Sequence, residues 1–190
     1  MKNILSSVEN VVWKTNGSIY KVLIEDEELL KNLESKIRSS INDNVSYKTN
    51  VKGSMTGWKT FLQDKDFKKL LSIYFDICSI DKIMEQYKSK KDGLFHLNVI
   101  EAWGNVLKKQ DKVIRHQHLG VSWSSILYFD NYANLKTDAG DIETKRGLVV
   151  TLPSYLSHWV EPIQKNVERC SLAWNWSFIP DWIRNEKIDG

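Results

Sequence analysis

The stretch Arg115–Phe129 reads RHQHLGVSWSSILYF and places His116 and His118, two of the four histidines of the chain, directly before an apolar run. Apolar and β-branched residues bounded by turn residues favour a strand. Side chains alternate between the two faces of a strand, so His116 and His118 point the same way if the segment is extended. Two imidazoles in that arrangement can reach one metal ion, and the alternative is that their spacing is accidental.

Further runs of the same character follow from Leu94 to the C-terminal region. They read LFHLNVIEAWGNVL, RGLVVTLPSYLSHWV and RCSLAWNWSFI, and each is rich in β-branched or aromatic residues. Turn residues are expected to separate the runs, at Gly104, Asn131, Asp138 to Gly140, Gly147 and Pro153. Short strands at regular spacing with turn signals between them are typical of an antiparallel sandwich or barrel.

The N-terminal half indicates a hairpin followed by a helix and a loop. Asn16-Gly17 is flanked by strand formers, which predicts a hairpin. Asp26 precedes a segment with acidic residues in its first turn and apolar residues at helical spacing, which are Leu29, Leu30, Leu33 and Ile37. Residues 39–57 are polar and rich in turn formers, and we expect a long loop there.

The segment that begins at Asp66 predicts either two helices or one helix broken near Ser79. Its apolar face consists of Phe67, Leu70, Leu71, Tyr74, Phe75 and Cys78. Lysines crowd its end at residues 88–91, before Gly93, and a solvated helix end explains them better than an anion site does. The sequence therefore predicts an α+β, mainly β chain whose β-barrel core is backed by N-terminal helices.

Length and composition are those of one globular domain. The chain has 190 residues with 42% hydrophobic residues, so we expect a single domain over 1–190, with the hairpin and helices in 1–93 and the β-core in 94–180. A net charge of +3 is too small to imply nucleic-acid or membrane binding by itself. The start of the chain lacks the features of a signal peptide, and two cysteines suit a reducing compartment, so we expect a cytoplasmic protein.

A second group of polar residues lies downstream of the first two histidines. His158 is 40 residues beyond His118, a separation that lets it converge from across a barrel. Arg169 opens an apolar strand, where a charge is costly without a partner, and Ser171 and Asn175 share its face by alternation. A guanidinium beside a hydroxyl suits a carboxylate held end-on. The fourth histidine, His96, is expected to be an ordinary core or surface residue.

With these motifs the sequence resembles the Fe(II)/2-oxoglutarate-dependent oxygenases. The resemblance is greatest to small prolyl-hydroxylase-like oxygenases of bacteria and phages, and it covers about half the chain, from Trp103 to Asn175. The matching segments are WGNV, HQH, SSILY, LPSYLSHWVEP and ERCSLAWN. The resemblance implies a double-stranded β-helix core, a jelly roll like that of the cupins, and decarboxylation of 2-oxoglutarate coupled to oxidation of a substrate.

The resemblance also implies roles for individual residues. His116 and His158 would bind Fe(II), and Arg169, helped by Ser171 and Tyr128, would bind the far carboxylate of 2-oxoglutarate, with ascorbate as a candidate reductant. The wider superfamily has a carboxylate two residues after the first histidine, and here His118 holds that position. Either the iron has three histidine ligands, or a carboxylate comes from elsewhere, for which the candidates are Asp130 and Asp138.

Two other readings of the same residues stay open. A cupin-type dioxygenase with three histidines on iron would not use 2-oxoglutarate, and Arg169 would then bind a carboxylate of the substrate itself. A non-catalytic β-sandwich that binds a sugar or a protein would have no metal affinity. The Arg-x-Ser pair that follows His158 at a distance of 11 residues disfavours such a module.

The substrate cannot be read from a motif. The family resemblance favours a protein or peptide side chain, while a small molecule or a nucleobase stays open, as does the oligomeric state. Long irregular segments around a barrel mouth usually shape the pocket, so we expect lids at Asn42–Trp58 and Asn131–Arg146. Met55, Trp58 and Trp123 either line an aromatic groove there or pack in the core.

Overall fold

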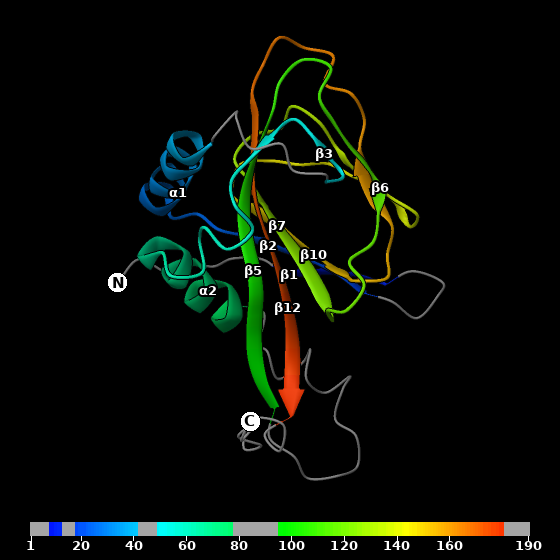
Figure 1. The fold of residues 1–190 in the computed structure, drawn as a ribbon. Helices are drawn as coiled ribbons and strands as arrows, with labels where there is room; N and C mark the ends of the chain where they lie inside the picture. The colour runs from blue at the N-terminus through cyan, green and yellow to red at the C-terminus, as the bar shows by residue number, and fades with distance from the viewer. Residues whose placement is uncertain (1–7, 13–17, 42–48, 78–94, 181–190) are drawn as a thin grey trace, which may run out of the picture.

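The structure is a computed structural model that describes residues 8–12, 18–41, 49–77 and 95–180 of the chain (Figure 1). The predicted Asn16-Gly17 turn lies outside the described residues. So do the second part of the predicted helical segment, with Cys78 and the lysine run, and residues 42–48 of the first expected lid.

The described residues form two antiparallel sheets, and the long pair of strands at the centre of Figure 1 belongs to the larger one. The larger sheet has the strand order β1 (Val8–Val12), β2 (Ser18–Leu23), β10 (Leu148–Pro153), β7 (Trp123–Tyr128), β12 (Arg169–Pro180), β5 (Phe95–Leu107) and β4 (Ser54–Met55). The smaller sheet has the order β3 (Val51–Lys52), β6 (Lys112–His116), β11 (His158–Val160), β8 (Leu135–Thr137) and β9 (Gly140–Ile142).

Two helices, α1 (Glu27–Ser40) and α2 (Lys65–Ile77), lie beside β5 and β12 of the larger sheet (Figure 1). The side chain of Asp26 accepts a hydrogen bond from the Leu29 N–H at 3.0 Å and caps α1 as predicted. The predicted apolar face of α1 is buried, and its four members pack with Phe67, Leu70 and Tyr74 of α2 against the sheet. The helices therefore cover one face of the larger sheet and leave the other face for the smaller sheet.

Strand β12 shows how alternation divides the two cores. Cys170, Leu172, Trp174 and Trp176 pack on the helix side, whereas Ala173 belongs to the core between the sheets. Arg169 and Ser171 share the side of Ala173 and line a pocket between the sheets. The alternation predicted for this strand is confirmed, and it is the reason why polar side chains gather inside the sandwich.

The mainly β fold with a jelly-roll core and N-terminal helices is confirmed, but several local expectations are wrong. Gly104 lies inside β5 and is not a turn between strands. Pro153 ends β10, and its carbonyl accepts from the Leu156 N–H at 3.0 Å, so the turn predicted there is confirmed. Residues 39–57 are not one loop, because β3 and β4 form in it, and the span Asn131–Arg146 contains β8 and β9. Each of these strands has only two or three residues, too few to show a period in the sequence.

Gly104 occupies its strand position because α1 comes very close to β5 there. A Cβ at this position would lie 2.5 Å from Cγ2 of Ile37, well inside van der Waals contact. Only glycine lets the helix approach the sheet this closely. The glycine that suggested a turn therefore serves helix packing.

Candidate functional site

Three histidines meet at one end of the smaller sheet. His116 is the last residue of β6 and His158 the first of β11, and the two are paired across the antiparallel ladder. His118 lies two residues beyond the end of β6, where its backbone N–H donates to the Ser154 carbonyl at 2.9 Å. One ligand atom from each ring lies within 4.8 Å of the others, so the three predicted residues form a cluster that can hold a metal ion.

His116 and His158 are each oriented by a backbone carbonyl two residues earlier in the chain. Nδ1 of His116 lies 2.7 Å from the Ile114 oxygen, and Nδ1 of His158 lies 3.1 Å from the Leu156 oxygen. Because a carbonyl can only accept, Nδ1 carries the proton in both rings and Nε2 keeps its lone pair. This orientation prepares both Nε2 atoms to coordinate a metal ion.

His118 has a different neighbour. Its Nδ1 lies 3.2 Å from Nδ2 of Asn175, which also donates to Oε2 of Glu101 at 3.0 Å. An amide nitrogen donates hydrogen bonds, so in this arrangement Nδ1 of His118 accepts and its proton resides on Nε2. To coordinate a metal ion through Nε2, His118 would have to shift that proton and change its contact with Asn175.

All three imidazoles are held neutral near pH 7. Burial lowers the pKa of His118 to about 3, helped by the neighbouring His158 and His116. Burial and the charge of His116 lower the pKa of His158 to about 4, and burial also lowers the pKa of His116. Neutral imidazole is the form that binds metal ions, so metal would not compete with protons here at neutral pH.

Arg169 and Tyr128 line the same pocket as the three histidines. The Arg169 side chain is buried, with its guanidinium carbon 4.9 Å from the centre of the Tyr128 ring. Its Nε and Nη2 atoms and the Tyr128 hydroxyl find no hydrogen-bond partner among the described residues. Burial raises the pKa of Tyr128, although Arg169 opposes the shift, so the hydroxyl remains a donor. Unpartnered donors in a buried pocket indicate a place for an anionic ligand.

Ser171 lies between two polar neighbours on the adjacent strands. It pairs with Tyr128 of β7 on one side and with Asn105 of β5 on the other. Asn105 Oδ1 and the Ser124 hydroxyl are buried and have no hydrogen-bond partner in the part of the chain that the structure describes, and both residues line the pocket. Sequence reasoning did not assign a role to either, although both lie in the WGNV and SSILY segments. Their relation to Arg169 depends on strand pairing, which the sequence does not reveal.

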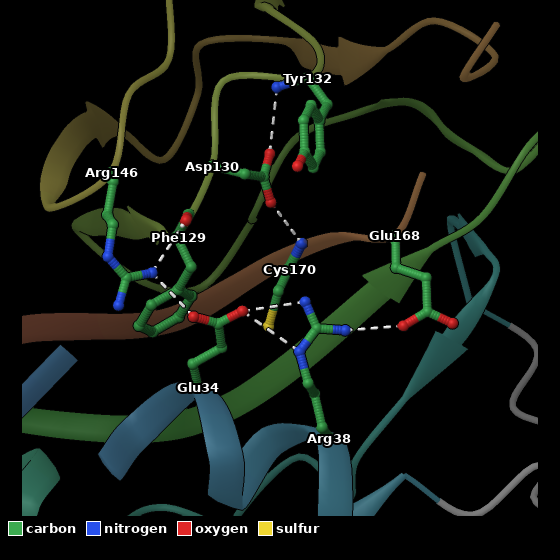
Figure 2. A network of polar contacts seen from close by, with 8 residues as sticks. All are labelled: Glu34, Arg38, Phe129, Asp130, Tyr132, Arg146, Glu168 and Cys170. Atoms are coloured by element: carbon green, nitrogen blue, oxygen red, sulfur yellow. Dashed lines mark hydrogen bonds and ion pairs between the residues drawn. The ribbon is translucent and has the colours of Figure 1, made fainter. Parts of the chain in front are cut away.

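A network of polar contacts holds the start of β12, on both sides of Arg169 (Figure 2). Oδ2 of Asp130 accepts from the Cys170 N–H at 2.7 Å, and the carboxylate of Glu168 pairs with Arg38 of α1 at 2.7 Å. Glu34 joins Arg38 to Arg146, as Figure 2 shows. Because the residues before and after Arg169 are both tied down, the network fixes where the guanidinium enters the pocket.

The two carboxylates considered as alternative metal ligands, Asp130 and Asp138, have other partners. Asp130 binds backbone N–H groups of Cys170 and Tyr132, Asp138 pairs with Arg115 at the surface, and neither joins the histidine cluster. Among the described residues, no carboxylate belongs to that cluster, so these two alternatives are wrong.

The three aromatic-groove candidates and His96 have different outcomes. Met55 and Trp123 are buried core residues, and for them packing is the correct explanation. Trp58 is half-buried and lines a groove beside the histidines. The side chain of His96 lies outside the described part of the structure.

Comparison with known proteins identifies the fold. Neither protein-family models nor curated proteins match the sequence. Among solved structures, the viral collagen prolyl hydroxylase vCPH of Paramecium Bursaria Chlorella virus-1, as its 2OG complex, is similar with a TM-score of 0.59 and 10% identity over 83% of this chain and 94% of that one. A prolyl-4-hydroxylase of Pseudomonas putida has a TM-score of 0.59 and 15% identity over 91% and 93%.

A third similar structure is HygX from Streptomyces hygroscopicus with nickel and 2-oxoglutarate bound, with a TM-score of 0.57 and 9% identity over 83% of this chain and 82% of that one. The chain thus has the fold found in 2-oxoglutarate and Fe(II) oxygenases, as the sequence motifs predicted. At such low identities the likeness concerns the fold alone. None of the described helices has both the length and the apolar character needed to cross a membrane.

Proposed function

We propose that the protein is an Fe(II)- and 2-oxoglutarate-dependent oxygenase. The observation that carries the proposal is one pocket with three converging histidines and a buried arginine whose Nε and Nη2 lack partners among the described residues. A metal site and an anion site that share one pocket are what an enzyme needs to chelate a 2-oxo acid to a metal. The shared fold of the oxygenases supports this reading.

The residues fit both groups. Neutral imidazoles suit Fe(II) and other first-row transition metals, and His116 and His158 already present Nε2. The guanidinium of Arg169, the Ser171 hydroxyl and the Tyr128 hydroxyl would hold a carboxylate by charge-assisted hydrogen bonds. His118 would be the third metal ligand.

Each group of residues has a separate task in this proposal. Iron with 2-oxoglutarate would supply oxidative decarboxylation of the cosubstrate coupled to oxidation of the substrate. Arg169, Ser171 and Tyr128 would orient the cosubstrate by its far end. The apolar walls formed by Ile126, Leu135 and Val160 would exclude water from the pocket. The substrate we favour is a protein or peptide side chain, in keeping with the two prolyl hydroxylases that share the fold.

Succinate formation tests the proposal against a cupin-type dioxygenase that does not use 2-oxoglutarate. The purified protein is incubated with Fe(II), ascorbate, oxygen and 2-oxoglutarate without substrate, and slow uncoupled formation of succinate is measured. We expect Arg169→Ala to reduce the rate of succinate formation by about tenfold or more, because a buried charged hydrogen bond to the cosubstrate is lost. Arg115→Ala, which removes an exposed arginine paired with Asp138, should leave it unchanged. Equal rates in wild type and Arg169→Ala would contradict the proposal.

A further inference from the structure

A groove opens beside the histidine cluster, between the middle of β5 and the turn that follows β6. Trp58, Glu101 and Trp103 line it together with His116, His118 and Asn175. Because it shares His116, His118 and Trp103 with the pocket of Arg169, a group that lies in it reaches the metal-binding side of that pocket. A substrate would therefore approach the three histidines through this groove.

The charge in the groove is unbalanced. Glu101 is half-buried and its contact is the amide of Asn175, with no cation beside it among the described residues. The half-buried carboxylates on and beside the helices instead meet a Lys or Arg, as Asp26, Glu34, Asp64 and Asp66 do. Described residues that line the groove include no Lys or Arg. A carboxylate partly removed from water without a counter-charge favours a cationic ligand.

The walls of the groove also suit a cation. The rings of Trp58 and Trp103 meet edge-on, with centroids 4.8 Å apart, and both line the groove. Asn175 is buried, and its Oδ1, which can accept a hydrogen bond from a cationic group, has no partner among the described residues. Aromatic faces beside a carboxylate attract ammonium and guanidinium groups.

The rim of the groove carries an exposed apolar side chain. Leu119 lines the groove and is 83% exposed, the largest exposure among the large hydrophobic residues described. Tyr155, 53% exposed, follows Ser154, whose carbonyl holds the His118 backbone. An exposed apolar side chain such as Leu119 at the rim suits the flanking residues of a peptide better than it suits a free amine.

We propose that this groove binds a basic side chain, lysyl or arginyl, of a peptide substrate, with Glu101 as the charge partner and the two tryptophans as the wall. The proposal deepens the proposed function, because it names the substrate class of that same site. It differs from the proline that the names of the two prolyl hydroxylases indicate for those proteins.

Binding of pentapeptides tests the proposal without turnover. The peptides are Ac-GGXGG-NH2 with lysine, arginine, norleucine or glutamate at X, and quenching of tryptophan fluorescence is measured on the full chain, both metal-free and loaded anaerobically with Fe(II) and 2-oxoglutarate. We expect the lysine and arginine peptides to bind about tenfold tighter than the norleucine peptide, with the preference weakening at high salt.

Two variants distinguish binding in the groove from the general attraction of a basic peptide to negative charge on the protein. Glu101→Gln should bring the lysine and norleucine peptides to about equal affinity. Glu161→Gln, the same change at an exposed carboxylate that contacts Trp159, should keep the preference. Equal binding of the lysine and norleucine peptides to the wild type would overturn the proposal that the groove selects a basic side chain. Free lysine that binds as tightly as the lysine peptide would overturn the proposal that the substrate is a peptide. Because the metal-free measurement needs no iron, it stands even if the oxygenase proposal fails.

Discussion

The Tyr128 hydroxyl is buried beside Arg169 without a hydrogen-bond partner among the described residues. A hydroxyl in that state costs stability, so Tyr128→Phe should leave the melting temperature of the ligand-free protein unchanged or raise it slightly. The same change should weaken 2-oxoglutarate binding by about tenfold, because one donor to the carboxylate is lost. Thermal unfolding and calorimetric titration measure the two effects. A lower melting temperature with unchanged 2-oxoglutarate affinity would assign Tyr128 a structural role only.

The pKa values of half-buried His118 and buried His158 predict how the stability of the protein depends on pH. Their pKa values in the folded protein, about 3 for His118 and about 4 for His158, are below the unfolded value of about 6.5, so the unfolded state binds more protons. Stability is therefore full above about pH 6.5 and falls as the pH is lowered toward the folded pKa values, by about 2 kcal/mol for each of the two side chains at pH 5. Urea unfolding of the metal-free protein at pH values from 7 to 5 measures this loss of stability.

The comparison with His118→Asn isolates one histidine. Between pH 6.5 and pH 5, the plot of unfolding free energy against pH should be less steep for this variant than for the wild type. The difference should correspond to about one proton fewer taken up on unfolding. Burial raises the pKa of Asp130, which acts in the opposite direction, so the difference between variant and wild type is more informative than the wild-type slope alone. Identical slopes for the two proteins would mean that His118 is not held neutral by the fold.

At the scale of elements, the close approach of α1 to β5 depends on Gly104. Gly104→Ala places a methyl group 2.5 Å from Ile37 Cγ2, and we expect a loss of about 1–3 kcal/mol in the free energy of unfolding. In the background of Ile37→Ala the same change should cost at least about 1 kcal/mol less, because the clashing atoms are gone. A double-mutant cycle by urea unfolding checks this. Additive effects would show that the two residues do not meet.

The start of β12 depends on Asp130 in a similar way. Asp130→Ala removes the acceptor for Cys170 N–H beside Arg169, and we expect 2-oxoglutarate affinity to fall by about tenfold while metal affinity stays within about twofold. Glu27→Ala, which removes an exposed carboxylate paired with Arg146 in the outer part of the same region, is the control and should change neither. Calorimetric titration measures both affinities. An equal loss of metal and 2-oxoglutarate binding after Asp130→Ala would indicate general unfolding instead of a displaced arginine.

The elements that sequence reasoning found are those with enough residues to show a period. The apolar face of α1, its Asp26 cap and the alternation along β12 are written in neighbouring residues, and they are correct. Gly104 was taken for a turn because its reason, the contact with Ile37, comes from a helix far away in the chain. The two- and three-residue strands β3, β4, β8 and β9 exist through pairing with other strands, which no local pattern records.

At the scale of the whole molecule, the sandwich brings together residues that are far apart in the sequence. Pairing of β6 with β11 sets His116 opposite His158, and pairing of β12 with β7 sets Ser171 beside Tyr128. The histidines, Arg169 and Ser171 could be proposed from the sequence because their residue types are unusual in apolar strands. Asn105, Ser124 and Glu101 could not, because their neighbours are known only once the strands are paired.

The central claim is that one pocket holds both Fe(II) and 2-oxoglutarate. Its most direct test is anaerobic titration of the metal-free protein with Fe(II) and then 2-oxoglutarate, following the visible charge-transfer band and tryptophan fluorescence. The account predicts a band that needs both additions, is absent in His158→Ala, and requires far more 2-oxoglutarate in Arg169→Ala. If iron binds tightly and 2-oxoglutarate changes nothing, or if iron does not bind at all, the claim is contradicted.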